Sequence, residues 1–306
     1  MSWIKRLFSR EVEEEKPEDI TDIVKKAEQG QILEYEEAMS FLNYLEGQLK
    51  LEPQLVRVKG KVVFIGDTHG DYISSREVLS RFSPDEYTLI FLGDYVDRGE
   101  NQIENVNFLL AKYIKHRKKI ILLRGNHESP VINQSYGFME VLYHVYGSYW
   151  PFLFIKYNEV FSNLPYAAKV NGLLAIHGGI AEGLKSLKQI EKLPKKDMIP
   201  SNKLAFEILW NDPSASVEGF SENLSRGGGT KYYGRLPLEA FLKENKLKGI
   251  VRAHEAYPDG YTFLFEGETG IKGMDHLLLS IFTCRYYGID PKVAIFDKDK
   301  LEVVSL

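Results

Sequence analysis

The chain has 306 residues, of which 44% are hydrophobic and 27% charged, a composition typical of a globular protein with a large buried core. Its 39 lysines and arginines against 43 aspartates and glutamates give a formal net charge of -4, which excludes the overall basic field expected of a nucleic-acid-binding protein. A single cysteine, Cys284, excludes an internal disulfide, and no apolar run has the length of a membrane span. We therefore expect a cytoplasmic protein.

The first 19 residues are predicted to be a charged segment without a catalytic role. Residues 1–8 are too short for the apolar region of a signal peptide, and residues 10–19 form a charge run that contains Pro17. Apolar side chains then recur at helical spacing over residues 20–27 and again over residues 38–49. We expect two helices within residues 20–54, and one catalytic domain that covers residues 20–306.

From residue 61 onward the pattern changes to short apolar strands separated by helical stretches. The first three are VVFI (62–65), TLIFL (88–92) and IILL (120–123), and this alternation predicts an α/β layered fold. Further strand-like runs cover residues 173–176, 249–251, 261–265, 277–282, 292–296 and 301–306. Because the runs from residue 261 onward have few helical intervals between them, we expect a second, more antiparallel sheet.

Polar clusters recur along this part of the chain, most of them directly after an apolar strand. They are GDTHGD (66–71), GDYVDRG (93–99), GNHE (125–128), HGG (177–179), RGGG (226–229) and RAHE (252–255). One such cluster alone is usually a plain turn. Four of the seven histidines lie in these clusters, and the carboxyl ends of strands that share a sheet meet at one edge, so we expect a single pocket.

The donor atoms in these clusters predict a particular class of metal site. Carboxylates, imidazoles and the carboxamide of Asn126 form a mixed nitrogen and oxygen set without cysteine. Such a set suits manganese, iron or zinc rather than calcium or a structural zinc ion.

Taken in order, these clusters resemble the signature motifs of the phosphoprotein phosphatase family of Ser/Thr protein phosphatases. VINQSYGF (131–138), LWNDP (209–213) and ENLSRG (222–227) extend the likeness to about residues 20–305. The resemblance implies an α/β fold with a two-sheet β-sandwich flanked by helices. It also implies hydrolysis of phosphoserine and phosphothreonine monoesters by direct attack of a hydroxide held by two divalent metals, manganese being expected and iron or zinc the alternatives.

The same resemblance implies a role for individual residues of this chain. Asp67 and His69 would bind the first metal, Asn126, His177 and His254 would complete the second, and Asp94 would bridge both. His127 would be the general acid that protonates the leaving alkoxide, and Asp97 would orient it. Arg98 and Arg226 would hold phosphate oxygens, although the glycine-rich context of Arg226 equally fits a flexible turn.

The chain departs from the family pattern near its end. Most members carry a SAPNYCG-like loop over the metals, whereas this chain reads TCRYYG (283–288), one residue shorter. Either Tyr286 or Tyr287 would therefore supply the phenol that faces the phosphate, and Arg285 adds a cation. Glu255 stands where eukaryotic members commonly have glutamine, and no regulatory tail is evident, so the chain resembles minimal prokaryotic catalytic subunits.

Two other functions fit parts of the sequence. A symmetrical dinucleoside tetraphosphate hydrolase shares the first motifs and the metal chemistry, but the LWNDP, INQSYGF and ENLSRG segments favour the protein phosphatase. A catalytically idle phosphoprotein-binding scaffold would usually have lost a ligand or the acid, and none is missing here. The partners implied are phosphoprotein substrates, with regulatory proteins left open.

Overall fold

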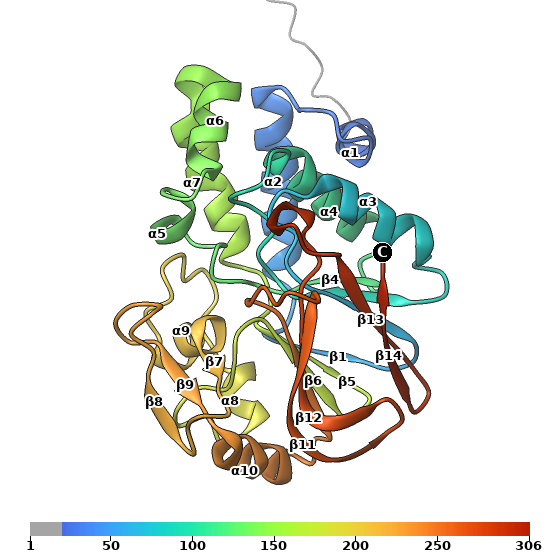
Figure 1. Cartoon of the computed structure of the whole chain (residues 1–306). Helices are drawn as coiled ribbons and strands as arrows, with labels where there is room; N and C mark the ends of the chain where they lie inside the picture. The colour runs from blue at the N-terminus through green and yellow to red at the C-terminus, as the bar shows by residue number, and fades with distance from the viewer. Residues whose placement is uncertain (1–19) are drawn as a thin grey trace, which may run out of the picture.

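The computed structural model describes residues 20–306, and two β-sheets packed face to face form its centre (Figure 1). The predictions for residues 1–19 lie outside the described residues. Both predicted N-terminal helices are present, as α1 (Ile20–Glu28) and α2 (Tyr35–Leu49). The predicted α/β fold with a two-sheet sandwich flanked by helices is confirmed.

The first sheet contains the three strands that precede the first polar clusters. In spatial order its strands are β14 (Lys300–Ser305), β13 (Lys292–Asp297), β2 (Val62–Ile65), β3 (Thr88–Phe91) and β4 (Ile120–Leu122). Strands β2, β3 and β4 run parallel, whereas β13 is antiparallel to both β2 and β14. All four residues of β2 are buried because Val62 and Phe64 face the other sheet, while Val63 and Ile65 face the helices.

The second sheet is mixed. In spatial order it contains β1 (Leu55–Val58), β5 (Ala167–Val170), β6 (Leu173–Ile176), β10 (Gly249–Arg252), β12 (Met274–Ile281) and β11 (Tyr261–Ile271). The predicted second sheet is present, but the expectation that it is more antiparallel is wrong, since three of its five strand pairs are parallel. The late strands β13 and β14 join the first sheet beside β2 instead. Apolar periodicity marks a strand, but it does not specify which other strand will be its partner.

Helices cover the outer faces of both sheets (Figure 1). Over the first sheet lie α1, α2, α3 (Tyr72–Arg81), α4 (Gln102–Lys115), α5 (Pro130–Asn133), α6 (Phe138–Tyr146), the 3₁₀ helix η2 (Gly147–Tyr149) and α7 (Trp150–Phe161). Beside the second sheet lie α8 (Leu187–Glu191), α9 (Lys203–Trp210), α10 (Arg235–Asn245) and a small sheet of β7 (Asp212–Pro213), β9 (Lys231–Tyr233) and β8 (Phe220–Glu222). A last 3₁₀ helix, η3 (Arg285–Tyr287), precedes β13.

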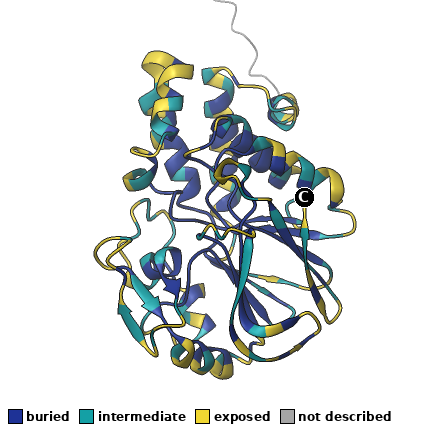
Figure 2. Ribbon diagram, in the orientation of Figure 1, coloured by how far each residue is buried: buried dark blue, intermediate teal, exposed yellow. Residues whose placement is uncertain are grey.

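Burial follows this layering, with the strands and the inner helix faces buried and the outer helix faces exposed (Figure 2). One apolar cluster lies between the two sheets, and one lies on the helical side of each sheet. Cys284 is fully buried, and burial raises the pKa of its thiol to about 12, in agreement with a packing role. No helix within residues 20–306 combines the length and apolar character needed to cross a bilayer.

Candidate metal centre

The polar clusters meet in space, although they are far apart in the sequence. Five of the six follow the carboxyl end of a strand in one of the two main sheets, namely β2, β3 and β4 in the first sheet and β6 and β10 in the second. The sixth, RGGG (226–229), lies between β8 and β9 of the small sheet. All six predicted metal ligands are buried, as are His127 and Asp97. The two sheets therefore contribute to one site between their strand ends.

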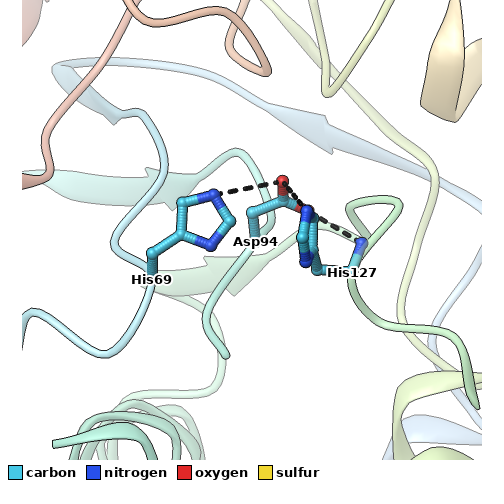
Figure 3. Close-up of side chains that lie close together, drawn as sticks. All are labelled: His69, Asp94 and His127. Carbon is cyan, nitrogen blue, oxygen red and sulfur yellow. Dashed lines mark hydrogen bonds and ion pairs between the residues drawn. The ribbon is translucent and has the colours of Figure 1, made fainter. Parts of the chain in front are cut away.

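Asp94 lies at the centre of a first group of ligand atoms. The ligand atoms of His69, Asp94 and His127 all lie within 4.8 Å of one another. Asp94 Oδ2 is 3.6 Å from His69 Nε2 and 3.9 Å from His127 Nε2 (Figure 3). Asp67 adjoins this group, since its Oδ2 is 4.0 Å from His69 Nε2.

The other oxygen of Asp94 belongs to a second group. Asp94 Oδ1 is 3.3 Å from His177 Nε2, and that nitrogen is 3.1 Å from His254 Nδ1 and 2.9 Å from Asn126 Oδ1. Asp94, His177 and His254 again keep their ligand atoms within 4.8 Å of one another. Asp94 is thus the residue shared by two candidate cation sites.

Backbone carbonyls orient two of the imidazoles. His69 Nδ1 lies 2.9 Å from the carbonyl oxygen of Val96, and His177 Nδ1 lies 2.9 Å from that of Leu92. A proton on each Nδ1 satisfies these contacts and leaves Nε2 with a free lone pair. In both rings Nε2 is the atom that faces Asp94.

Asp67 supplies evidence that the site is built for a cation. Its Oδ1 accepts a hydrogen bond from the His254 backbone nitrogen at 3.1 Å, whereas its Oδ2 is buried without any hydrogen-bond partner among the described residues. Burial raises the pKa of Asp67, and the Asp94 carboxylate raises it further. A divalent cation would relieve both the unpaired oxygen and the repulsion between the two carboxylates.

Burial alone would lower the pKa of the predicted ligand His177, but the Asp94 carboxylate outweighs burial and raises it. The charge states of the other two ligand histidines, His69 and His254, suit metal binding directly. Burial lowers the pKa of His69 to about 3, with a further contribution from His127. Burial, followed by the nearby guanidinium of Arg226, holds the pKa of His254 well below its usual range. Both rings are therefore neutral near pH 7, the form in which imidazole binds a metal. Together with the carboxylates and the Asn126 carboxamide, these residues fit a pair of divalent ions.

His127 and Asp97 form a separate pair at the edge of the first group. His127 Nδ1 lies 2.6 Å from Asp97 Oδ2, while Asp97 Oδ1 accepts a hydrogen bond from the backbone nitrogen of Phe138 at 3.0 Å. Burial alone would lower the pKa of His127, but the carboxylates of Asp94 and Asp97 outweigh it and raise the pKa. This imidazole therefore holds a proton more readily than His69 or His254 does.

A small open pocket lies over these groups. Its volume is about 270 Å³, and the residues that line it are His69, Asp94, Arg98, His127, Arg226, His254, Glu255, Ala256, Phe282 and Tyr287. The Arg98 guanidinium lies 5.2 Å from the ring centre of Tyr136 and 5.8 Å from that of Tyr287. Arg226 pairs with Asp212, with 2.9 Å between Nε and Oδ2. Two arginines thus border a pocket that three of the six predicted ligands also line.

The two adjacent tyrosines of η3 point to different places. Tyr287 lines the pocket, and its ring centre is 6.1 Å from that of His69. Tyr286 is not part of the pocket lining and packs against Gly99, where its ring occupies the space that a Cβ atom would take. Of the two phenols that the sequence left open, the structure places Tyr287 in the pocket.

The backbone is strained where it presents these side chains. Among the described residues, ten non-glycine residues have positive φ, and the five in the site are His69, Asp94, Asp97, Arg98 and His254. Residues other than glycine rarely adopt a positive φ, so the surrounding structure must stabilise this backbone conformation. Gly125 shows how tight the packing is, since a Cβ atom there would collide with Asp94 Oδ1.

Three supporting residues received no role from the sequence. Glu128 accepts hydrogen bonds from the backbone nitrogens of Asp94 and Tyr95, both at 2.8 Å, and of Gly125 at 2.9 Å. Asp212 joins Arg226 to the fully buried Arg252, whose Nη2 is 2.9 Å from Asp212 Oδ1. All three belong to motifs that the sequence showed, but no sequence signal distinguished a support from a ligand.

Comparison with known proteins gives a consistent result. Residues 60–258 match the family described as calcineurin-like phosphoesterase. The chain is 33% identical to a protein phosphatase 2A catalytic subunit from Dictyostelium discoideum, over 80% of this chain and 78% of that protein. It is 32% identical to a serine/threonine-protein phosphatase of Schizosaccharomyces pombe, over 81% of this chain and 80% of that protein.

A solved structure extends the likeness to the fold. A protein serine/threonine phosphatase from Saccharomyces cerevisiae, with similarity to human phosphatase PP5, superimposes with a TM-score of 0.80 at 23% identity, covering 94% of this chain and 95% of that chain. The extended sequence identity and the candidate cation sites around Asp94 lead to the same conclusion. The chain is a member of the calcineurin-like phosphoesterases and, within them, of the phosphoprotein phosphatase family of Ser/Thr protein phosphatases.

Proposed function

We propose that this protein hydrolyses phosphoserine and phosphothreonine monoesters to the free hydroxyl and inorganic phosphate. The observation that carries this proposal is Asp94, which is shared by two groups of candidate ligands beneath a pocket that His127 and two arginines also face. Two closely spaced cation sites with an acid beside them suit attack on phosphorus from one side and protonation of the leaving oxygen on the other.

The metal ligands in this proposal are those that the sequence predicted. Asp67 and His69 would hold one ion, Asn126, His177 and His254 the other, and Asp94 both. When bound, two divalent ions offset the charge of the phosphate oxygens and lower the pKa of a water placed to attack phosphorus. Manganese is the metal we propose, since the donor set mixes imidazole nitrogen with carboxylate and carboxamide oxygen.

The residues at the pocket walls are proposed to bind the phosphate dianion. The planar guanidinium groups of Arg98 and Arg226 can each donate two hydrogen bonds to a pair of phosphate oxygens. Arg226 is held by Asp212, whereas Arg98 is exposed and lies over two aromatic rings. The Tyr287 phenol lies in the same pocket, and burial raises its pKa to about 12, so it stays protonated and can donate a hydrogen bond.

His127 is the proposed proton donor. As the bond between phosphorus and the serine or threonine oxygen breaks, that oxygen develops negative charge and takes the His127 proton from Nε2. Nε2 is free for this role because Nδ1 faces Asp97 at 2.6 Å. Asp97 stabilises the protonated imidazole before the step and keeps its orientation afterward.

Several finer assignments belong to the same proposal. We propose that residues 20–306 form one catalytic domain of the minimal type found in prokaryotic members, supported by Glu255 after His254. The lone buried thiol of Cys284 is consistent with a cytoplasmic location, which we propose as well. Partners would be phosphoprotein substrates, with regulatory proteins as further candidates.

The deciding experiment compares two substrates under the same metal conditions. Phosphate release from a phosphothreonine peptide and hydrolysis of diadenosine tetraphosphate are measured after chelation and again after manganese is added. We expect manganese to restore turnover of the peptide. Cleavage of the dinucleotide alone would replace the substrate assignment, and manganese binding without turnover of either would favour a phosphoprotein-binding scaffold.

A further inference from the structure

The β-sandwich is open along one edge, which is distinct from the catalytic pocket. There, β1 ends the second sheet and β4 ends the first, so each of these strands is paired on one side only. A groove of about 610 Å³ lies at this edge, and strand residues 56–58 and 120–122 contribute to its lining. It shares no lining residue with the catalytic pocket.

Apolar side chains from both sheets line the groove. Val56 and Val58 of β1 are half-buried and pack against the apolar cluster between the sheets, to which Ile121 of β4 belongs. Ile120 and Leu122 of the lining belong to the apolar cluster on the helical side of the first sheet, so the groove borders that cluster as well as the exposed end of the inter-sheet core. A ligand that placed apolar side chains there would extend that core and remove these residues from water.

Basic residues surround this apolar lining. Arg57 and Lys59 lie on the β1 side, and Arg117, Lys118 and Lys119 precede β4. The one carboxylate in the lining, Glu52, already accepts from Arg117 Nε at 2.7 Å and from the Tyr113 hydroxyl at 2.9 Å.

Three of these cations remain available. Arg57 pairs with Glu191 at 2.6 Å, but Lys59, Lys118 and Lys119 form no ion pair with any residue in the described part of the chain. The protein as a whole carries a net charge of -4, so this positive rim contrasts with the molecule around it. Charge complementarity therefore favours an acidic ligand.

We propose that this groove binds a short, extended, acidic segment of a partner protein, with apolar side chains in the groove and carboxylates on the lysines. Side chains of an extended segment alternate between two faces, which matches an apolar lining bordered by cations. The backbone of such a segment can also bond the free side of an edge strand. This proposal concerns binding alone and does not depend on the catalytic assignment.

A simpler explanation exists for the lysines at this edge, and the experiment must distinguish it from peptide binding. Lysine beside an edge strand prevents a second copy of the same protein from pairing with it. That function requires neither an apolar groove nor affinity for a peptide. The two explanations therefore differ in whether an acidic peptide binds and in what happens when the lysines are reversed in charge.

The test measures fluorescence anisotropy of a labelled peptide in which glutamate alternates with valine, titrated with the full chain. Lys118→Glu with Lys119→Glu should weaken binding by at least about tenfold, and raising salt from about 50 to about 300 mM should weaken wild-type binding. Lys243→Glu with Lys246→Glu is the matched control, because these exposed lysines of the α10 end make the same charge change away from the groove. It should change affinity less than about twofold.

Two further peptides and one further variant test the apolar part. A peptide with serine in place of valine should bind weakly, as should one with lysine in place of glutamate, and Val58→Asn should weaken binding while circular dichroism stays unchanged. Equal binding of the lysine peptide would overturn the proposal. The proposal would also be overturned if no peptide bound and the Lys118 and Lys119 variant self-associated in sedimentation. The lysines would then serve only to prevent the edge strand from pairing with a second copy of the protein.

The chain's own acidic segment is the remaining occupant to exclude. Changing Glu13, Glu14 and Glu15 to glutamine in the full chain should leave peptide affinity unchanged if the groove is free for a partner. If the peptide bound only to this variant, the segment at residues 10–19 would be the occupant and the partner assignment would fall.

Discussion

At the scale of single residues, His127 is the group whose proposed role can be separated most clearly from metal binding. It contacts Asp97 at 2.6 Å through Nδ1, which leaves Nε2 to face the pocket. An alkyl leaving group needs a proton as it departs, whereas p-nitrophenolate is a weak base and leaves without one. The two leaving groups therefore test the acid separately from the rest of the site.

We predict that His127→Ala lowers kcat for a phosphothreonine peptide by about 10²- to 10⁴-fold and lowers kcat for p-nitrophenyl phosphate much less. Steady-state kinetics with both substrates at saturating manganese measure this, and metal analysis checks that two ions remain. Equal losses on both substrates would show that His127 supports the metals or the fold rather than the proton transfer.

Asp212 is a second residue whose importance only the structure shows. It pairs with Arg226 at the pocket wall and with Arg252, which is fully buried. Removing one member of a buried ion pair leaves an uncompensated charge, a change that typically costs several kcal/mol.

We predict that Asp212→Asn lowers the free energy of unfolding by about 3 kcal/mol and raises KM for the phosphopeptide, because Arg226 loses its support. Urea unfolding and peptide kinetics measure the two effects. Glu239→Gln, which breaks the exposed pair with Arg235, is the control and should change stability by less than about 1 kcal/mol. A similar loss in both variants would contradict the argument.

At the scale of elements, the short helix η3 is held in place by Arg285, the cation that sets this chain apart from the family pattern. The Arg285 backbone nitrogen donates to Asp71 Oδ2 at 2.8 Å, and its guanidinium contacts Ser74 Oγ and lies 2.6 Å from Glu77 Oε2. These three contacts attach the loop that carries Tyr287 to the N-cap and the first half of α3, up to Glu77.

We predict that Arg285→Met raises KM for the phosphopeptide several-fold with a smaller effect on kcat, because Tyr287 no longer stays over the pocket. Stability should fall by less than about 1 kcal/mol, since the pair with Glu77 is about one-third exposed. Arg285→Lys should restore part of the affinity. Inhibition by inorganic phosphate provides an independent measure, and an unchanged inhibition constant would oppose the anchoring role.

At the scale of the whole molecule, Lys195 connects distant parts of the chain. Its Nζ donates to the carbonyl oxygen of Leu49, at the end of α2, at 2.9 Å and to that of Asn163, after α7, at 2.8 Å. Burial lowers the pKa of Lys195 from 10.5 to about 8. Between these two values the unfolded chain binds more protons at this residue than the folded protein does.

The contribution of Lys195 to the free energy of unfolding should therefore rise with pH between about 8 and 10.5. Below that range the buried lysine is charged, and burying the charge costs free energy in the folded protein. We predict that the unfolding free energy of the wild type, relative to Lys195→Met, increases by about 1–2 kcal/mol across this window, after allowance for partial solvent exposure. Urea unfolding of both proteins at several pH values measures this. A difference that stays constant or falls would contradict the assignment.

Much of the fold follows from local pattern. The apolar runs at residues 62–65 and 173–176 have the same bounds in the sequence prediction and in the structure, and the two N-terminal helices follow from apolar spacing. The pairing of β13 with β2 could not be predicted, because neighbours in a sheet are selected by packing across the whole chain. Strand β1, with one half-exposed face at an open edge, gave no clear apolar run.

The order of residues along the chain already specifies which residue types follow each strand and, through the family motifs, the chemistry expected of them. Two further features became known from the three-dimensional arrangement: Tyr287 rather than Tyr286 enters the pocket, and Asp212 supports Arg226. The reason is physical: a motif specifies which side chains a strand end carries, whereas distances of a few ångströms between motifs depend on the packing of two sheets. The same packing leaves the sandwich open at β1 and β4, which no local pattern in the sequence indicated.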